Sequence, residues 1–65
     1  MKTVTLTMRL IKEHKVLAQY AEINEEGNPK VVKALVQPIY LRKSEILDSS
    51  GDLPMAFNVT FVPIV

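Results

Sequence analysis

Side chains suited to catalysis are sparse in this sequence. His14 is the only histidine, and there is no cysteine to act as a nucleophile or to share a metal with it. Nucleophilic catalysis needs a nucleophile, a base and an orienting group within reach of one another. His14 lies in the polar run of residues 12–15, which is typical of a solvated turn. We therefore interpret it as a loop histidine and predict that the chain is not an enzyme.

Two groups of carboxylates have the right atoms for a cation. Asp48, Ser50 and Asp52 alternate oxygen-bearing side chains, but a calcium loop of this kind needs glycine at its sixth position, where Leu53 stands. The second group consists of Glu22, Glu25 and Glu26. We interpret both groups as polar turns between strands. No metal and no cofactor is expected.

Nucleic-acid binding is a third possible chemistry, because it needs basic and aromatic side chains together. Residues 1–15 carry four basic residues against one acid, although the whole chain has a net charge of only +1. Small barrels bind single strands by combining a basic groove with aromatic stacking platforms. The candidate residues are Arg9, Lys12, Lys15, Tyr40, Arg42 and Lys43. With so few charges, such binding would be weak and quickly lost as salt rises.

The elements that must position these residues are mainly β-strands. Residues 3–11 alternate cleanly, with apolar side chains at the even positions, and this pattern predicts a half-buried strand. After the polar link at residues 12–15, residues 16–23 predict a second strand with both faces partly apolar, and the two strands form a hairpin. A helix over residues 16–23 is the alternative, because short apolar runs are hard to assign by period.

The second half of the chain continues this β pattern. Pro38 cannot donate a ladder hydrogen bond and divides the third strand, and Ser44 is expected to cap a helical turn. The expected elements are a turn over residues 24–29, strands over residues 31–36 and 39–41, a helical turn over residues 45–48 and a last strand over residues 56–62. The predicted fold is mainly β: a small twisted antiparallel sheet or partly closed barrel of four or five strands with one short helical turn, in a single domain, residues 1–65.

Part of this order resembles a known family. Tyr20 to Gly27 reads Tyr-Ala-Glu-Ile-Asn-Glu-Glu-Gly, a predicted strand follows, and Pro38 to Lys43 reads Pro-Ile-Tyr-Leu-Arg-Lys. These runs are similar to the swapped-hairpin DNA-binding family of AbrB type, whose order is strand, glycine turn, strand, Pro-Ile-x-Leu-Arg, short helix, strand. The resemblance covers about half of the chain and implies an intertwined dimer that binds DNA through basic residues. A full strand before the match and a longer segment before the proline depart from the family.

The composition points to a partner. A chain of 65 residues buries only about 60% of its unfolded surface, yet 48% of this chain is hydrophobic and no cysteine can staple it. We therefore expect a non-catalytic protein-interaction module, a homodimer formed through edge strands and an exposed apolar face. A small nucleic-acid-binding protein or transcriptional regulator is the alternative. The expected interface residues are Val16, Ala18, Tyr20, Phe61, Ile64 and Val65.

The location of the protein is expected to be cytoplasmic. No apolar run of 7–15 residues follows the N-terminus as a signal peptide would require. Apolar stretches such as residues 34–36 and 39–41 are far too short to cross a membrane, so no membrane partner is expected. An enzyme whose active site is completed between subunits stays open as a third hypothesis, although no residue favours it.

Overall fold

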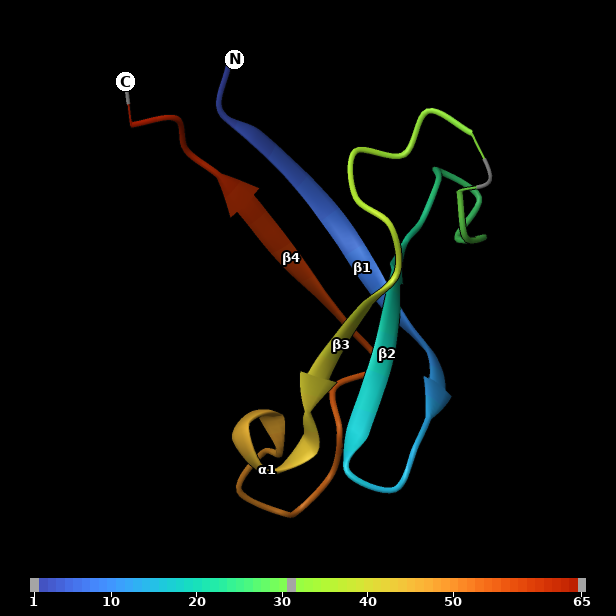
Figure 1. Ribbon diagram of the computed structural model, residues 1–65, viewed down its shortest axis with the longest axis vertical. Helices are drawn as coiled ribbons and strands as arrows, with labels where there is room; N and C mark the ends of the chain where they lie inside the picture. Colours follow the sequence, from blue (N-terminus) through green and yellow to red (C-terminus); the bar gives the residue numbers. More distant parts are fainter. Residues whose placement is uncertain (1, 31, 65) are drawn as a thin grey trace.

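Four antiparallel strands form one curled sheet. The computed structural model describes residues 2–30 and 32–64. The elements are β1 (Val4–Glu13), β2 (Leu17–Glu22), β3 (Ile39–Arg42), the helical turn α1 (Lys43–Ile46) and β4 (Ala56–Phe61). The strands lie in the order β3-β2-β1-β4 and curl into a half-barrel (Figure 1). This confirms the predicted fold class of a small, partly closed β structure with one helical turn.

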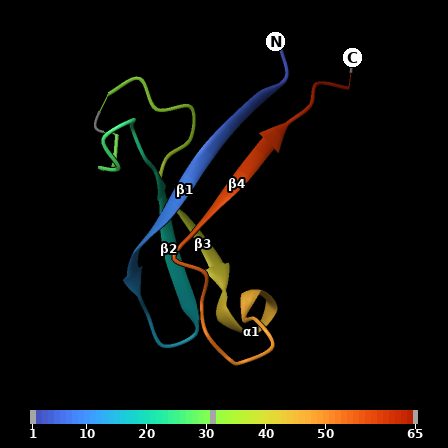
Figure 2. The same ribbon diagram turned by 180° about the vertical axis from the view of Figure 1, so that it is seen from behind.

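Strand β1 is the longest strand and holds the sheet together. Its first half pairs with β4, from Val4 opposite Phe61 to Arg9 opposite Ala56. Its second half pairs with β2, and the two pairings overlap only near the middle of β1. Figures 1 and 2 show the result: the paired strands β1 and β4 project away from β2 and β3, toward the end of the molecule that carries both chain termini.

The β1–β2 hairpin forms as predicted, and the helical alternative for residues 16–23 is wrong. The backbone N–H of His14 donates to the carbonyl of Leu17 at 2.8 Å, which closes the turn. A β-bulge lies in β1 between Leu10 and Lys12. Because a bulge increases the local right-handed twist, it contributes to the curl of the sheet.

The core lies on the concave side of the sheet. It is built from four buried residues, Leu6, Met8, Ala18 and Tyr20. Tyr20 is fully buried, its hydroxyl donates to the carbonyl of Pro54 at 2.8 Å, and its ring centroid lies 4.7 Å from that of Phe57. Burial of the ring, and secondarily the charge of Glu13, raise the pKa of the Tyr20 hydroxyl.

The expected interface at β2 therefore needs a correction. Ala18 and Tyr20 were predicted to face a partner, but both have 0% exposure and pack inside this chain. Their backbone pairs with Leu41 and Ile39 of β3, and the concave curl brings β1 and β4 side chains over them. Alternation alone could not distinguish a face that meets a partner from one that the chain covers with its own later segments.

The predicted strand over residues 31–36 is not formed at residues 32–36, which are bent and irregular; Val31 lies outside the described residues. A side chain from β2 accepts hydrogen bonds from the backbone of this segment. One carboxylate oxygen of Glu22 accepts the backbone N–H of Leu35 at 2.7 Å and that of Val36 at 3.3 Å. These two backbone N–H groups therefore bond to a side chain and not to a neighbouring strand. In the same segment, Lys33 has a positive φ of 60°.

The remaining elements differ from the prediction mainly at their ends. Strand β3 confirms the expected piece at residues 39–41 and extends it by one residue, and β4 matches the predicted last strand except at Val62. The helical turn begins two residues earlier than expected, with Arg42 as its N-cap, so Ser44 lies inside the turn and does not cap it. In the described part of the chain, no helix has the length and apolar character needed to cross a membrane.

Candidate functional site

The concave side of the β1–β4 pair is an apolar face that is only partly covered. We call it the ribbon face, and its residues are Val4, Leu6, Phe57, Val59 and Phe61. The register of the two strands places Val4 opposite Phe61 and Leu6 opposite Val59, so these side chains share one side of the sheet. Leu6 is buried, whereas the other four are only half-buried.

The convex side of the same two strands is polar. The hydroxyl oxygens of Thr5 and Thr60 lie 2.9 Å apart in a hydrogen bond, and the Thr7 hydroxyl donates to Asn58 Oδ1 at 2.9 Å. These cross-strand pairs suit a surface in contact with water. The β1–β4 pair is therefore amphipathic, with one side suited to water and the other suited to a hydrophobic contact.

The position of the ribbon face explains why it stays half-open. Helical turn α1 and the segment that leads to β4 lie at the opposite end of the sheet from the chain termini (Figure 1). The view from behind shows the same separation (Figure 2). From the irregular segment before β3, Val36 packs against the core, but the outer part of the ribbon face, at Val4 and Phe61, extends past the ends of β2 and β3.

Strand β4 also presents a free backbone edge. The backbone N–H of Leu10 donates to the carbonyl of Met55 at 2.9 Å, which marks this pair as hydrogen-bonded. Because the backbone direction alternates along a strand, Phe57, Val59 and Phe61 also point their N–H and C=O groups toward β1. The N–H and C=O groups of Ala56, Asn58 and Thr60 point the other way, and no strand among residues 2–30 and 32–64 pairs with them.

The opposite edge of the sheet, at β3, is short and protected. The backbone N–H of Lys43 donates to the carbonyl of Val16 at 2.9 Å, so in β3 it is Tyr40 and Arg42 that direct their backbone groups outward. Pro38 precedes this edge, and Arg42 places a charge on it. Proline and charge are the usual means by which an edge strand avoids pairing with another chain.

The residues predicted as an interface fall in different places. Phe61 belongs to the ribbon face, and Ile64 follows it with 98% exposure. Val16 is 57% exposed but lies in the β1–β2 turn, at the other end of the sheet. Val65 lies outside the described residues. The structure thus leaves Phe61 and Ile64 near one end of the sheet, and Val16 lies in the turn at the other end.

Two further exposed apolar residues lie next to β4, and the sequence reasoning missed the first of them, Met55. Met55 precedes the strand and Val62 follows it, and each is 64% exposed. Their signal was available in the sequence, because residues 53–65 contain no charged residue. A surface strand normally carries charges that keep it apart from other chains, so this run is unusual for an edge.

The candidate nucleic-acid residues are brought together only in part. Lys12, Gln19 and Tyr40 lie opposite one another in three adjacent strands and so form one row on the convex side. Arg42 lies further along β3, two residues after Tyr40, and Lys15 is in the β1–β2 turn. Arg9 and Lys43 are engaged elsewhere: Arg9 donates to the carbonyl of Gly27 at 3.0 Å, and the Lys43 ammonium lies 3.4 Å from a Glu13 carboxylate oxygen.

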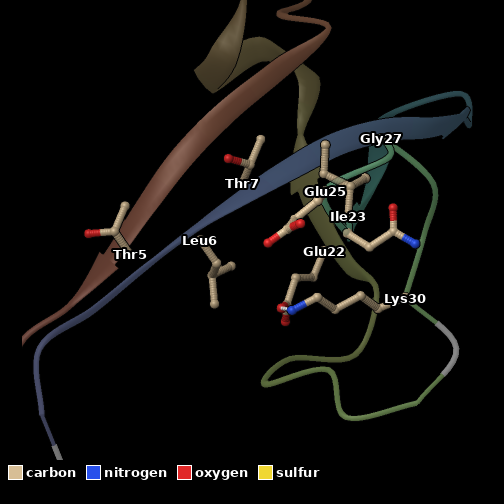
Figure 3. Close-up of a pocket in the computed structure, with 9 residues that line it drawn as sticks. Thr5, Leu6, Thr7, Glu22, Ile23, Glu25, Gly27 and Lys30 are labelled. Atoms are coloured by element: carbon tan, nitrogen blue, oxygen red, sulfur yellow. Dashed lines mark hydrogen bonds and ion pairs between the residues drawn. The ribbon is translucent and has the colours of Figure 1, made fainter.

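A polar pocket of about 460 Å³ lies between β1 and the turn after β2. Figure 3 shows its main polar contact, in which the Lys30 ammonium reaches the carboxylate of Glu22. The hydrogen bond from Lys30, with those from the backbone of Leu35 and Val36, lowers the pKa of Glu22 despite its burial. An ionised carboxylate with all these donors is suited to holding the chain in place and is a poor general base.

The other polar groups considered for chemistry are also engaged locally. Asp48 accepts hydrogen bonds from the backbone of Asp52 and from the hydroxyl and backbone of Ser50, which lower its pKa. His14 Nε2 lies 3.4 Å from Gln19 Oε1, and its ring stands beside that of Tyr40. Over residues 2–30 and 32–64, histidine and carboxylate side chains do not gather in the groups of three that a metal ion would need.

Comparison of this chain with known protein families, curated proteins and solved structures found no match. The function is therefore inferred from the geometry of the ribbon face and of the β4 edge.

Proposed function

We propose that this protein is a non-catalytic protein-interaction module that acts as a homodimer through the ribbon face and an edge strand. The observation that carries the proposal is the excess of surface. A folded monomer of 7.3 kDa is expected to have an accessible surface of about 4,200 Å². This chain has 5146 Å². Its radius of gyration, 12.7 Å, is also larger than the value of about 11 Å expected for its length.

The size of the excess supports a second copy as the partner. The difference between the two surface areas is roughly 1,000 Å². A stable protein interface of standard size buries about 800 Å² on each partner. Closing the half-barrel against another subunit would therefore bring the surface of each chain close to that of an ordinary folded protein.

The chemistry of the surface supports the same partner. Phe61, at the end of the ribbon face, is followed along the chain by Val62 and Ile64, which are exposed. Burying this apolar area is favourable by about 25 cal/mol for each Å² removed from water. Because residues 53–65 are uncharged, two copies can bring these segments together without like-charge repulsion.

Sedimentation equilibrium over a range of concentrations tests the proposal. The expected result is a mass that rises from that of one chain toward that of two chains as the concentration increases to high micromolar values. Phe61→Ser, at the exposed end of the ribbon face, should shift this transition to higher concentration, whereas Val16→Ser, in the distant turn, should leave it unchanged. A wild-type chain that remains a monomer at high micromolar concentration would contradict the proposal.

Nucleic-acid binding is the second candidate, and the row formed by Lys12, Gln19 and Tyr40 favours it. Tyr40 is 55% exposed and could stack on a base, while Lys12 and Arg42 could contact phosphates. Oligonucleotide binding at about 50 mM salt tests this candidate, because electrostatic attraction is strong under those conditions. Loss of binding in Tyr40→Ala and in Lys12→Ala would support it, and no binding of single- or double-stranded DNA or RNA would rule it out.

A further inference from the structure

We propose that β4 pairs with β4 of a second copy, antiparallel and about a two-fold axis at Val59, so that the two sheets of four strands become one continuous sheet. This inference rests on the proposed homodimer and specifies its interface. In this arrangement the ribbon faces of the two subunits become neighbours on the same side of the joined sheet. Because both sheets curl toward this side, the joined sheet turns its apolar side inward and the two ribbon faces cover each other.

The choice of edge follows from a comparison of the two ends of the sheet. Strand β3 has four residues, Pro38 before it and Arg42 within it. Strand β4 has six residues and neither charge nor proline, and its register with β1 is regular from Ala56 to Phe61. Charges, prolines and bulges are the features that keep natural edges unpaired. Strand β4 has none of them between Ala56 and Phe61.

The backbone of β4 is already directed for such pairing. Ala56, Asn58 and Thr60 point their N–H and C=O groups away from β1, in the plane of the sheet. A second strand on this side would form backbone hydrogen bonds with these groups, as β1 does with those of Phe57, Val59 and Phe61. The new pairing therefore requires no change in the fold of either subunit.

Axes at Asn58 and at Val59 give β4 overlaps of equal length with a second copy, and the side-chain pairs favour the axis at Val59. It places Asn58 opposite Thr60 of the partner subunit on the polar side, which repeats the kind of contact that Thr7 makes with Asn58 within one chain. On the apolar side it places Phe57 opposite Phe61 of the partner subunit. Aromatic cross-strand pairs of this kind are among the favourable pairs in antiparallel sheets.

A disulfide test reports directly on this arrangement, because the chain has no cysteine of its own. In the proposed pairing, the two copies of Val59 face each other in a non-hydrogen-bonded pair, where Cα atoms are about 4.5 Å apart. This separation lies in the range that a disulfide accepts. Val59→Cys under mild oxidation is therefore expected to give a covalent dimer.

Asn58→Cys and Thr60→Cys are matched controls on the same strand. Each of these residues lies diagonally from its own copy across the axis, at about 7 to 8 Å, which is too far for an unstrained disulfide. We expect Val59→Cys to cross-link roughly tenfold faster than either control. Faster cross-linking of Asn58→Cys or of Thr60→Cys would overturn the register centred on Val59.

A second pair of variants separates the edge from the homodimer itself. Thr60→Pro removes an outward N–H without removing a β1–β4 hydrogen bond, and Thr60→Ala keeps that N–H. Both variants lose the Thr60 hydroxyl, so Thr60→Ala is the reference, and Thr60→Pro should raise the dimer dissociation constant by roughly tenfold or more above that of Thr60→Ala, with both variants folded by circular dichroism. If Thr60→Pro dimerises like the wild type, the β4 edge is not the interface although the homodimer stands. If the wild type is a monomer, the proposed function fails as well.

Discussion

At the scale of single residues, Glu22 makes the hydrogen bonds that tie the middle of the chain to β2. Its side chain is 3% exposed, and it contacts the segment after the turn through Lys30, Leu35 and Val36. The sequence placed Glu22 in an acidic cluster beside a turn, which indicated a solvated charge. Its partners lie up to 14 residues away along the chain, and neither hydrophobic period nor local propensity carries information about such contacts.

Replacing Glu22 by glutamine should lower the free energy of unfolding by about 2 kcal/mol at neutral pH, because a charged hydrogen-bond acceptor is lost. The pKa of Glu22 is lowered in the folded chain, so its stabilising effect is fully present above the ordinary value of 4.5. It is lost as the pH falls through the folded-state pKa. The difference between wild type and Glu22→Gln, measured by urea unfolding, should therefore shrink at acidic pH.

Glu25→Gln is the control for this prediction, because Glu25 belongs to the same acidic cluster but is exposed. It should leave the free energy of unfolding nearly unchanged at every pH. Equal stability of Glu22→Gln and the wild type at neutral pH would show that the Glu22 contacts do not hold the segment before β3.

Tyr20 shows the same limitation for a long-range hydrogen bond. Tyr20 was expected at an interface, but its hydroxyl is buried and reaches the carbonyl of Pro54, 34 residues further along the chain. Tyr20→Phe should lower the free energy of unfolding by about 1 to 2 kcal/mol, because the Pro54 carbonyl loses its donor. Tyr40→Phe, at an exposed position, is the control for the loss of a tyrosine hydroxyl and should have little effect. A Tyr20→Phe chain as stable as the wild type would contradict this role.

At the scale of elements, the strands with a clean period of two were predictable and the others were not. Strands β1 and β4 follow from alternation of apolar and polar residues within a few positions, which is a local property. The segment at residues 32–36 has strand-forming residues but gives its backbone donors to a carboxylate. The predicted start of α1 was two residues too late. Ser44 has the residue type that usually marks an N-cap, whereas Arg42, the actual N-cap, provides no side-chain oxygen.

The two phenylalanines of β4 should differ in their effects although they lie on the same face of one strand. Phe57 packs on the buried ring of Tyr20, whereas Phe61 lies at the end that projects beyond β2 and β3. Phe57→Ala should lower the free energy of unfolding of dilute protein by about 3 kcal/mol. Phe61→Ala should lower the free energy of unfolding of dilute protein by only about 1 kcal/mol. Its main effect should be a weaker homodimer.

Urea unfolding at low concentration and sedimentation at high concentration separate these two effects. Equal losses of monomer stability in the two variants would show that the outer part of the ribbon face is already covered within one chain. A Phe61→Ala protein that dimerises as well as the wild type would show that this part of the face is outside the interface.

At the scale of the whole molecule, the mismatch between apolar content and interior was readable from composition. A short chain that is 48% hydrophobic cannot enclose all of its apolar side chains, and the surface of 5146 Å² agrees with that expectation. Which face stays open was not readable in the same way. Strand β2 was expected to face a partner because both of its faces are partly apolar, but the curl of the sheet covers its core side. The open apolar face lies along β1 and β4 instead.

Hydrogen exchange along β4, followed residue by residue, tests the central claim most directly. The amides of Phe57, Val59 and Phe61 bond to β1 and should be protected at every concentration, so they serve as internal references. The amides of Asn58 and Thr60 point away from β1, and their exchange should slow markedly as the protein is concentrated and β4 pairs with its copy. Rapid exchange of Asn58 and Thr60 in concentrated protein, while the reference amides stay protected, would contradict the β4-paired homodimer.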